Sequence, residues 1–440
     1  MSHRTVGVCI LGGGVVASGT IAILRQQADL LRQRTGVSFD IRHVIVRDPH
    51  KPRSFDLPVA TDAAAAIADP RTDIVVELIG GLDVADRCIQ QALSLGKPVV
   101  TANKSLLAAR GPQLFALARQ HNTCLAFEAS CAGGIPIIAA LSHGLVANRI
   151  DALTGIVNGT CNFILTQMSR NGWSYSHALA EAQKAGLAEA DPALDVSGRD
   201  AAQKLALLAS LAFNVRVREE DIHIEGIDRL DEADIRFAGE MNYVIKLLAI
   251  ARRHADTISL RVHPSLVHRD NVLAEVSGSF NAVSVWGHAL GHALFYGRGA
   301  GQSPTASAVV ADLVSVALGL TKLAFTQLNI YPDQIAPAKI LPFDQLSSRY
   351  YFRLAARDEP GVMAQITRIL GEHRISLAAI SQHESGDARA VPVVITTHLA
   401  REGAVAAALA EIDRLPSIMP PTVCLRIVDS PKEFAAADGL

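Results

Sequence analysis

Short apolar runs alternate with helical stretches over the first 145 residues of the chain. The runs expected to form strands are Thr5–Leu11, Ser38–Val46, Asp73–Ile79, Pro98–Thr101 and Thr123–Glu128. The stretches expected to form helices are residues 15–34, 84–95, 104–121 and 134–145. Because strands that alternate with helices are joined by right-handed crossovers, we predict an α/β fold with a Rossmann-type, doubly wound parallel sheet over residues 1–145.

The pattern is less regular over residues 146–304. Strands are expected at residues 150–157, 222–230 and 258–267, and helices near residues 160–170, 175–186, 198–213 and 233–249. This order predicts a mixed α/β domain, which we expect to hold the substrate and to form the contacts of a homodimer or homotetramer. A further apolar helix, Thr305–Leu320, is expected to pack back onto the first domain as part of residues 305–330.

A proline-containing linker, residues 331–348, separates the last part of the chain from the rest. Beyond it, strands are expected at Tyr350–Ala355, Ser376–His383, Val391–Thr397 and 422–428, and helices at Gly361–His373 and 402–412. The resulting β-α-β-β-α-β order predicts a ferredoxin-like domain over residues 349–435.

The composition is that of an ordinary globular protein. The 440 residues suffice for roughly two to four domains, and 49% of them are hydrophobic against 19% charged. The net charge of −2 gives no reason to expect nucleic acid or an anionic membrane as a partner. We recognise no signal peptide and no apolar run of about 18 residues, so we expect a cytoplasmic protein without a membrane span.

A glycine cluster connects the first expected strand to the first expected helix. Gly12-x-Gly14-x-x-Ala17 fits the dinucleotide-binding fingerprint, whose first two glycines allow a tight turn and the close approach of a pyrophosphate. The helix that begins with Val15 and Val16 offers its main-chain N–H groups to the phosphates. We therefore expect a dinucleotide cofactor at these residues.

The end of the second strand bears on the choice between NADP and NAD. Arg47 and Asp48 stand there, followed by Lys51 and Arg53. An arginine suits a 2′-phosphate and an acidic residue suits a ribose hydroxyl, so Arg47 favours NADP, with NAD as the alternative. The other interpretation is that these charges form only a solvated turn.

The stretch over residues 182–204 combines a dense set of acids with a lysine. Its charged members of interest are Glu189, Asp191, Asp195, Asp200 and Lys204. Asp200 and Lys204 are four apart on an expected helix, so their side chains share one face. Carboxylates hold the ammonium group of a zwitterion, and a lysine polarises or protonates a carbonyl oxygen. The alternative is a plain surface ion pair.

Five blocks, in order along the chain, resemble those of the homoserine dehydrogenase family. They are Val99–Lys104 (VVTANK), Phe127–Pro136 (FEASCAGGIP), Gly155–Thr160 (GIVNGT), the acidic stretch 182–204, and Gly299-Ala300-Gly301 followed by Pro304-Thr305. The family carries out the reversible NAD(P)-dependent oxidation of L-homoserine to L-aspartate 4-semialdehyde in threonine, methionine and isoleucine biosynthesis. No kinase region precedes residue 5, so we expect the monofunctional form.

The resemblance implies a role for individual side chains. Lys204 would be the catalytic lysine that handles the proton of the substrate hydroxyl. Lys104 would reach both the cofactor and the substrate oxygen. Asp200 and Glu189 would bind homoserine, with Asp195 close by.

The resemblance also implies contributions from the main chain. Gly186 and Gly301 would line the cofactor site. A monovalent cation, usually Na+, would be bound by Glu128 and by the main-chain carbonyls of Cys131, Gly133 and Ile135. Oxygen ligands of this kind suit a hard cation.

The turn Asp358-Glu359-Pro360-Gly361-Val362 precedes the first helix of the C-terminal domain. It resembles a turn of ACT domains, small modules that bind amino acids. Proline fixes φ, and the N-terminus of the following helix can bind a carboxylate. The resemblance implies feedback regulation with threonine as the expected effector. The alternative is an oligomerisation module without a ligand.

Other functions stay open at this point. A different semialdehyde-linked oxidoreductase would share the scaffold, and a non-catalytic amino-acid sensor would keep the C-terminal module without the chemistry. A thiol mechanism at Cys131 has no recognisable base beside it. His288 and His292 have a spacing compatible with zinc, but they lack an HExxH motif, and Gly287 and Gly291 interrupt a helix there.

Overall fold

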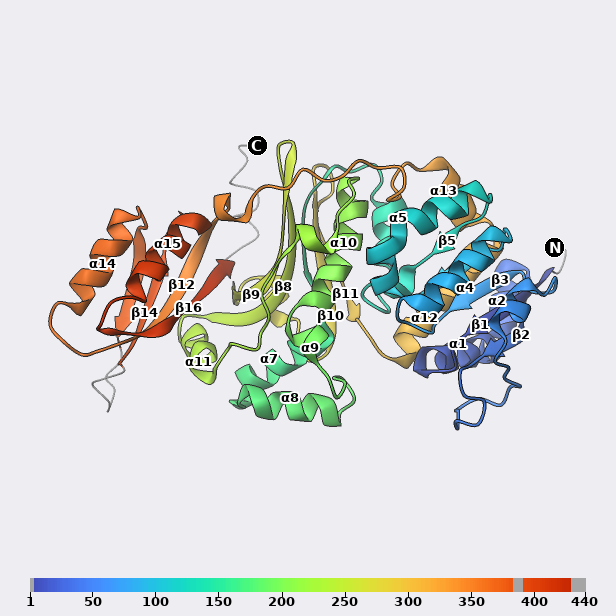
Figure 1. The fold of residues 1–440 in the computed structure, drawn as a ribbon, viewed down its shortest axis with the longest axis horizontal. Helices are drawn as coiled ribbons and strands as arrows, with labels where there is room; N and C mark the ends of the chain where they lie inside the picture. The colour runs from blue at the N-terminus through green and yellow to red at the C-terminus, as the bar shows by residue number, and fades with distance from the viewer. Residues whose placement is uncertain (1–3, 383–390, 429–440) are drawn as a thin grey trace. The chain divides into compact units, whose positions relative to one another are not determined.

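The computed structural model describes residues 4–382 and 391–428 of the chain (Figure 1). The chain divides into two compact units, each built from segments that are far apart in the sequence. The first unit comprises Met1–Gly159, Asp200–Ile222 and Ser279–Ala338, and the second comprises Thr160–Arg199, His223–Gly278 and Lys339–Leu440. His383, the predicted end of a strand, and residues 429–435, the predicted end of the last domain, lie outside the described residues.

A parallel five-stranded sheet in the order β2-β1-β3-β4-β5 begins the first unit. Its strands are β1 Arg4–Leu11, β2 Val37–Ile45, β3 Ile74–Glu77, β4 Val99–Thr101 and β5 Leu125–Ala126. The helices that connect them are α1 Val15–Gln26, α2 Ala28–Thr35, α3 Ala63–Ala68, α4 Asp83–Ser94 and α5 Lys104–Gln120. The last six residues of β1 are all buried, as in a strand that is covered on both faces. The predicted doubly wound sheet is confirmed.

A helix from much later in the sequence lies against this sheet domain. Helix α12 (Gln302–Ala317) packs closely on α1, because a Cβ added to Gly19 would come within 2.9 Å of Ala306 and Gln302. Helix α13 (Leu320–Gln327) follows at an angle of 76°. Phe325 of α13 and Tyr331 beyond it pack their rings against Phe115 of α5.

Three antiparallel strands and a long helix complete the first unit. The strands, in the order β11-β10-β6, are β6 Ile150–Ile156, β10 Phe280–Gly287 and β11 Gly291–Arg298. Helix α10 runs from Arg199 to Phe213, and most of its side chains are buried. The shorter helical segments are η1 Glu128–Ser130, α6 Ile137–Ala139, η2 Ala140–Gly144 and η3 Glu219–Asp221.

The second unit contains a sheet in the order β8-β9-β16-β12-β14-β13, with β7 beside β9 and β15 beside β12. Its strands are β7 His223–Ile224, β8 Tyr243–His254, β9 Thr257–His268, β12 Ser347–Ala356, β13 Leu377–Gln382, β14 Val391–Thr397, β15 Ala400–Arg401 and β16 Ile418–Val428. Its helices are α7 Gly159–Asn171, α8 Tyr175–Lys184, α9 Ala193–Val196, α11 Glu232–Glu240, η4 Val272–Glu275, η5 Phe343–Gln345, α14 Val362–Glu372 and α15 Glu402–Ile412. Because β16 pairs with β9 in parallel, the C-terminal strands and a hairpin from the middle of the chain share one sheet.

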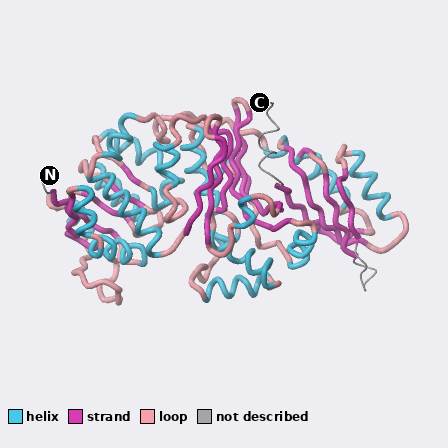
Figure 2. The backbone as a smooth tube through the Cα atoms, turned by 180° about the vertical axis from the view of Figure 1, so that it is seen from behind, coloured by secondary structure: helices cyan, strands magenta, loops and turns pink. Residues whose placement is uncertain are grey.

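The C-terminal part of this unit has the strand order β16-β12-β14-β13, with α14 and α15 on one face (Figure 2). Tyr350 and Phe352 of β12 belong to the same apolar cluster as Ile366 of α14 and Ile412 of α15. A single cluster that includes both helices requires that they cover the same face of the sheet. The predicted ferredoxin-like domain is confirmed.

One prediction for the middle of the chain was wrong, and one hairpin was missed. The helix expected at 233–249 ends as α11 at Glu240, and Tyr243–His254 is the strand β8. A strand buried on both faces gives a continuous apolar run, which periodicity alone does not distinguish from a buried helix. Residues 280–298, where we predicted no strand, form the hairpin of β10 and β11, and Gly287 faces Gly291 across its turn.

Helix length and composition decide whether a segment can cross a membrane. Among the described residues, no single helix is both long and apolar enough to cross a membrane. The bent pair of α12 and α13 meets that criterion only when the two helices are taken together, by length and composition.

Candidate active site

The glycine-rich turn between β1 and α1 leaves the start of α1 open to a ligand. Gly12 has a φ of +109°, and a Cβ there would lie 2.6 Å from the carbonyl oxygen of Leu78, so the turn requires glycine. Gly14 is the N-cap of α1 and provides no side-chain cap, and a Cβ added to it would meet nothing within 4 Å. Val15 is 65% exposed, and Val16 is half-buried. The first N–H groups of α1 therefore fit the phosphates of a dinucleotide.

Two arginines follow β2 near this turn. Arg47 is exposed in the loop directly after the strand. Arg53 is held more tightly, because its guanidinium donates to the main-chain carbonyls of Asp48, Pro49 and Lys51. A Cβ added to Gly13 would lie 2.8 Å from Nε of Arg53, so the arginine covers one side of the glycine turn.

A chain of hydrogen bonds fixes the start of α5 at the carboxyl end of the parallel strands. Glu77, the buried last residue of β3, accepts a hydrogen bond from the hydroxyl of Thr101 at 2.6 Å. The same hydroxyl accepts from the N–H of Asn103 at 3.0 Å. The side chain of Asn103 caps α5, and Lys104 is the first residue of that helix. The VTANK block thus holds Lys104 at the edge of the sheet where ligands of open α/β folds bind.

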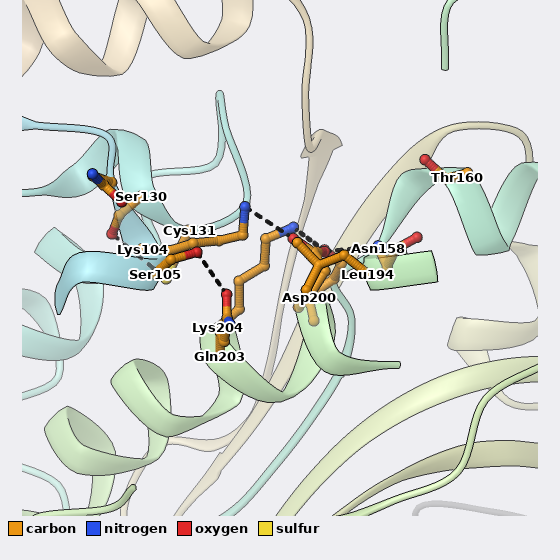
Figure 3. A network of polar contacts seen from close by, with 12 residues as sticks. Lys104, Ser105, Ser130, Cys131, Asn158, Thr160, Leu194, Asp200, Gln203 and Lys204 are labelled. Atoms are coloured by element: carbon orange, nitrogen blue, oxygen red, sulfur yellow. Dashed lines mark hydrogen bonds and ion pairs between the residues drawn. The ribbon is translucent and has the colours of Figure 1, made fainter. Parts of the chain in front are cut away.

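Asp200 connects two lysines from distant parts of the sequence (Figure 3). Its Oδ1 lies 3.0 Å from Nζ of Lys104, and its Oδ2 lies 2.8 Å from Nζ of Lys204. The side chain of Asn158 donates to the same Oδ2 at 2.7 Å. Lys204 also donates to the carbonyl of Val157 at 2.7 Å. The shared helix face predicted for Asp200 and Lys204 is confirmed.

Burial and the two lysines act on the pKa of Asp200 in opposite directions. Burial raises it, but the charges of Lys204 and Lys104 and the hydrogen bonds from Lys204 and Asn158 lower the pKa to about 2. The carboxylate is therefore ionised at neutral pH. One negative charge faces two lysines, so the cluster suits an oxygen that gains negative charge during a reaction.

Several neighbours of the lysines have roles that no sequence motif indicated. Asn158 and Val157 follow β6 within a block that we had noted, but Val157 acts through its carbonyl, which every residue carries. Ser105 of α5 donates a hydrogen bond of 2.9 Å to Gln203 of α10 beside the lysines (Figure 3). This bond ties together the two helices from which Lys104 and Lys204 come.

Glu128 is buried at the start of the loop predicted to bind a cation. Its carboxylate accepts hydrogen bonds from the N–H groups of Ile138 and Ala139, at 2.8 Å each. Its own N–H donates to Asp312 at 2.8 Å. Burial raises the pKa of Glu128, and the two N–H groups lower it by less. Each carboxylate oxygen keeps a second lone pair that these bonds do not use.

The rest of this loop contributes carbonyl oxygens. Those of Cys131 and Gly133 accept no hydrogen bond from the described residues, whereas the carbonyl of Ile135 accepts from Ile137 at 2.8 Å. Within the described ranges, no group of three or more His, Cys, Asp or Glu side chains is placed to bind a metal. Burial raises the pKa of the Cys131 thiol to about 12, so the thiol is neutral and unsuited to nucleophilic attack.

The remaining predicted residues are divided between the two units. Gly301, with a φ of +115°, is the N-cap of α12 in the first unit. Gly186 follows α8, Glu189 is exposed in the next loop, and Asp195 lies in α9, all within the second unit. The structure thus brings Lys104, Asp200 and Lys204 into one cluster of the first unit. Gly186, Glu189 and Asp195 belong to the second unit.

The glycine turn and the lysine cluster lie in the same unit, and both Gly12 and Lys104 follow the carboxyl ends of parallel strands. A dinucleotide bound at such an edge carries the hydride chemistry, and the lysines supply positive charge to a substrate oxygen. The fold and the site together define a nicotinamide-dependent oxidoreductase.

Comparisons with known proteins identify the family. The model of the homoserine dehydrogenase NAD-binding domain matches residues 12–128, that of homoserine dehydrogenase matches residues 136–314, and that of the ACT domain matches residues 350–416. A homoserine dehydrogenase from Pseudomonas aeruginosa is 42% identical over 432 residues, which cover 97% of this chain and 99% of the relative. The chain belongs to the homoserine dehydrogenase family, and homoserine dehydrogenase is its activity.

Solved structures of relatives agree in fold. A homoserine dehydrogenase from Thiobacillus denitrificans, 43% identical, superposes with a TM-score of 0.92 over 98% of this chain and 100% of its own. A hyperthermophilic archaeal homoserine dehydrogenase in complex with NADPH is 26% identical, with a TM-score of 0.61 over 71% of this chain and 98% of its own.

Proposed function

We propose that Lys204 transfers the proton of the substrate hydroxyl, and that Lys104 steadies the same oxygen and contacts the cofactor, in the reversible oxidation of L-homoserine to L-aspartate 4-semialdehyde. The observation that carries this proposal is the bridge that Asp200 makes between the two lysine ammonium groups. A nicotinamide cofactor held at the glycine turn would supply the hydride chemistry.

Lys204 has a donor left for a substrate oxygen. An ammonium group has three N–H donors, and the carbonyl of Val157 and the carboxylate of Asp200 accept two of them. The third has no acceptor among the described residues. In the direction of semialdehyde reduction, both lysines stabilise the charge that develops on the aldehyde oxygen, and Lys204 delivers the proton. In the direction of homoserine oxidation, the hydroxyl proton leaves through Lys204 or a water that it orders.

Asp200 acts mainly by holding these lysines in place. Its carboxylate accepts from Lys104, Lys204 and Asn158, which uses most of its capacity. We therefore assign the ammonium group of homoserine chiefly to Glu189, with Asp195 close by and Asp200 contributing its charge. The exposed carboxylate of Glu189 has no partner among the described residues, which suits a ligand-binding role.

We propose NADP as the preferred cofactor, with NAD as the alternative. Gly12, Gly14, Val15 and Val16 would hold the phosphates, Gly301 of the same unit would line that site, and Gly186 is assigned to the cofactor as well. Arg47 binds the 2′-phosphate, because it is exposed directly after β2 and a guanidinium fork matches a phosphate. The NADPH complex of the archaeal relative supports this choice.

A monovalent cation, with Na+ as the expected ion, binds at the loop after η1. The carbonyl oxygens of Cys131 and Gly133 accept no hydrogen bond from the described residues and fit a hard cation. Ile135 and Glu128 complete the set through their remaining lone pairs.

The C-terminal domain binds an amino acid, with threonine as the proposed effector. Gly361 is the N-cap of α14 with a φ of +91°, and no side chain caps the helix, so its first N–H groups fit a carboxylate. Feedback by threonine is consistent with a cytoplasmic enzyme of threonine, methionine and isoleucine biosynthesis that acts as a homodimer or homotetramer.

The proposal is tested by initial rates of homoserine oxidation with NADP and with NAD. We expect a higher kcat/KM with NADP, and Arg47→Ala should remove most of that preference while leaving the NAD rate unchanged. An equal preference in the wild type and in Arg47→Ala would show that Arg47 belongs only to a solvated turn.

Regulation is tested by a threonine titration of the same rate. The wild type should be inhibited at millimolar threonine, and Asp358→Ala should need more threonine while its basal rate is kept. A rate that stays flat across this range in the wild type would favour the oligomerisation module.

A further inference from the structure

Asn281, the second residue of β10, is buried without a hydrogen-bond partner. Its exposed fraction is 1%, yet neither Oδ1 nor Nδ2 is bonded to any of the described residues. Most buried amides are satisfied, and an unmet one is costly, so such an exception needs a cause.

The amide of Asn281 is enclosed between two glycines. A Cβ added to Gly299 would lie 1.9 Å from Cγ of Asn281 and 2.0 Å from its Nδ2, so only glycine fits at position 299. On the other side, the position of a Cβ on Gly159 would lie 3.5 Å from Oδ1. The amide therefore contacts the turn at Gly159 and the loop Gly299–Gly301.

Both of these segments lead to the active site. Asn158, directly before Gly159, donates to Asp200 of the lysine cluster. Gly301 is the N-cap of α12 and belongs to the proposed cofactor site. A movement of either segment would therefore change both the active site and the surroundings of the Asn281 amide.

The loop Gly299–Gly301 next to the amide offers main-chain N–H donors. The main-chain N–H groups of Gly299, Ala300 and Gly301 donate no hydrogen bond to any described residue. Oδ1 of Asn281 thus lies beside the main chain of buried Gly299, in a loop whose N–H groups bond to no other described residue.

We propose that Asn281 is a positioning residue whose amide pairs with the main chain of the Gly299–Gly301 loop when the nicotinamide dinucleotide binds. The pairing fixes this loop around the cofactor, so Asn281 acts through the loop and does not touch the cofactor itself. The inference rests on the cofactor role proposed for Gly301. The amide, which has no partner among the described residues, gains one when the cofactor binds.

The test replaces the amide by an apolar group of the same branching, Asn281→Leu. The thermal midpoint of the free protein should stay the same or rise, because an unmet polar group is removed. The KM for the dinucleotide should rise about tenfold with a smaller change in kcat, and the midpoint shift produced by the reduced dinucleotide should shrink.

Asn162→Leu is the matched control. Asn162 is 2% exposed, but its amide donates to the carbonyl of Val276 and accepts from Lys246. This control should lower the midpoint of the free protein and leave the KM for the dinucleotide unchanged. The two variants therefore separate an amide that supports the free fold from one that supports cofactor binding.

Asn281→Ala keeps the test decisive if the leucine does not fit. Unchanged KM and an unchanged ligand-induced midpoint shift, in whichever variant folds, would overturn the proposal. Each variant is measured with the dinucleotide that the wild type prefers, NADP or NAD. A wild type that does not prefer NADP would contradict only the role of Arg47. The inference about Asn281 is tested separately, by the KM and the midpoint shift of its variants.

Discussion

Each of the two units contains a buried charged cluster, and the two clusters have opposite compositions. In the first unit, one carboxylate, Asp200, bridges Lys104 and Lys204. In the second unit, one guanidinium, Arg426, bridges the carboxylates of Glu402 and Glu225. The first cluster has more positive charge than the single carboxylate balances, whereas the second is closed by its own negative groups.

This difference in charge balance distinguishes a catalytic site from a cluster that stabilises the fold. Arg426 uses Nε and Nη2 on Glu402 and Nη1 on Glu225, so each of its three nitrogens donates to a carboxylate. Burial alone would lower the pKa of Arg426, but the bond to Glu402 and the charges of both glutamates hold it above its ordinary range. Lys204 keeps one donor for a ligand. Positive charge in excess of the carboxylate therefore indicates function, and a cluster whose guanidinium is balanced by carboxylates indicates structure.

The largest effect is expected from Lys204→Ala. Removal of a group that transfers the substrate proton should lower kcat by about 10²- to 10⁴-fold, because general acid–base catalysis contributes that much. The KM values should change little, and the thermal midpoint should fall only modestly, because Lys104 still pairs with the buried carboxylate of Asp200. Initial rates and calorimetry on the same preparation check this.

Lys246→Met is the control for Lys204→Ala. Lys246 is also a buried lysine, but its Nζ donates to Asn162 and to the carbonyl of Val276, and burial lowers its pKa to about 8. Its replacement should reduce stability and preserve kcat. A folded Lys204→Ala enzyme with a nearly normal rate would contradict the proposed role.

Arg426→Met should have the next largest effect, and on stability. It leaves Glu402 buried without its partner, so the free energy of unfolding should fall by about 3–5 kcal/mol. The double variant Arg426→Met/Glu402→Gln, which removes the stranded charge, should recover much of the loss. Urea denaturation measures both, and a kcat that falls as steeply as in Lys204→Ala would remove the distinction between the two clusters.

More of the first cluster than of the second could be predicted from the sequence. Asp200 and Lys204 are four apart on one helix, so their spacing alone predicts that they meet. Lys104 lies far away in sequence, and only the family resemblance joined it to them. Arg426, Glu402 and Glu225 have no comparable signal, because β16 meets β9 through sheet pairing that no local pattern specifies.

The same contrast applies to the fold. The alternation of strands and helices predicted the parallel sheet, and the β-α-β-β-α-β order predicted the C-terminal domain. Tyr243–His254 was mistaken for helix because burial on both faces hides the period of two. The role of Asn281 follows from its contact with Gly299, which exists only once the chain is folded.

A smaller effect is expected from the pH dependence of Asp200. Its pKa falls from 3.8 to about 2 on folding, so its ionised form stabilises the native state by about 2 kcal/mol above pH 4. That contribution is lost as the pH falls from about 4 to about 2, because the unfolded chain binds the proton first. The gap in unfolding free energy between the wild type and Asp200→Asn should shrink accordingly. A gap that is constant over this range would mean that the lysines do not depress the pKa.

The smallest effect on stability is expected from the exposed ion pair of Arg368 and Glu372. Arg368 and Glu372 are 2.7 Å apart, as are Arg426 and Glu402. The side chains of the first pair are 60% and 52% exposed, and those of the second are 8% and 7% exposed. Because water and salt screen the exposed pair, a double-mutant cycle on Arg368→Ala and Glu372→Ala should give a coupling of about 0.3–0.5 kcal/mol. A coupling there as large as the loss in Arg426→Met would mean that distance, and not burial, sets the strength of these ion pairs.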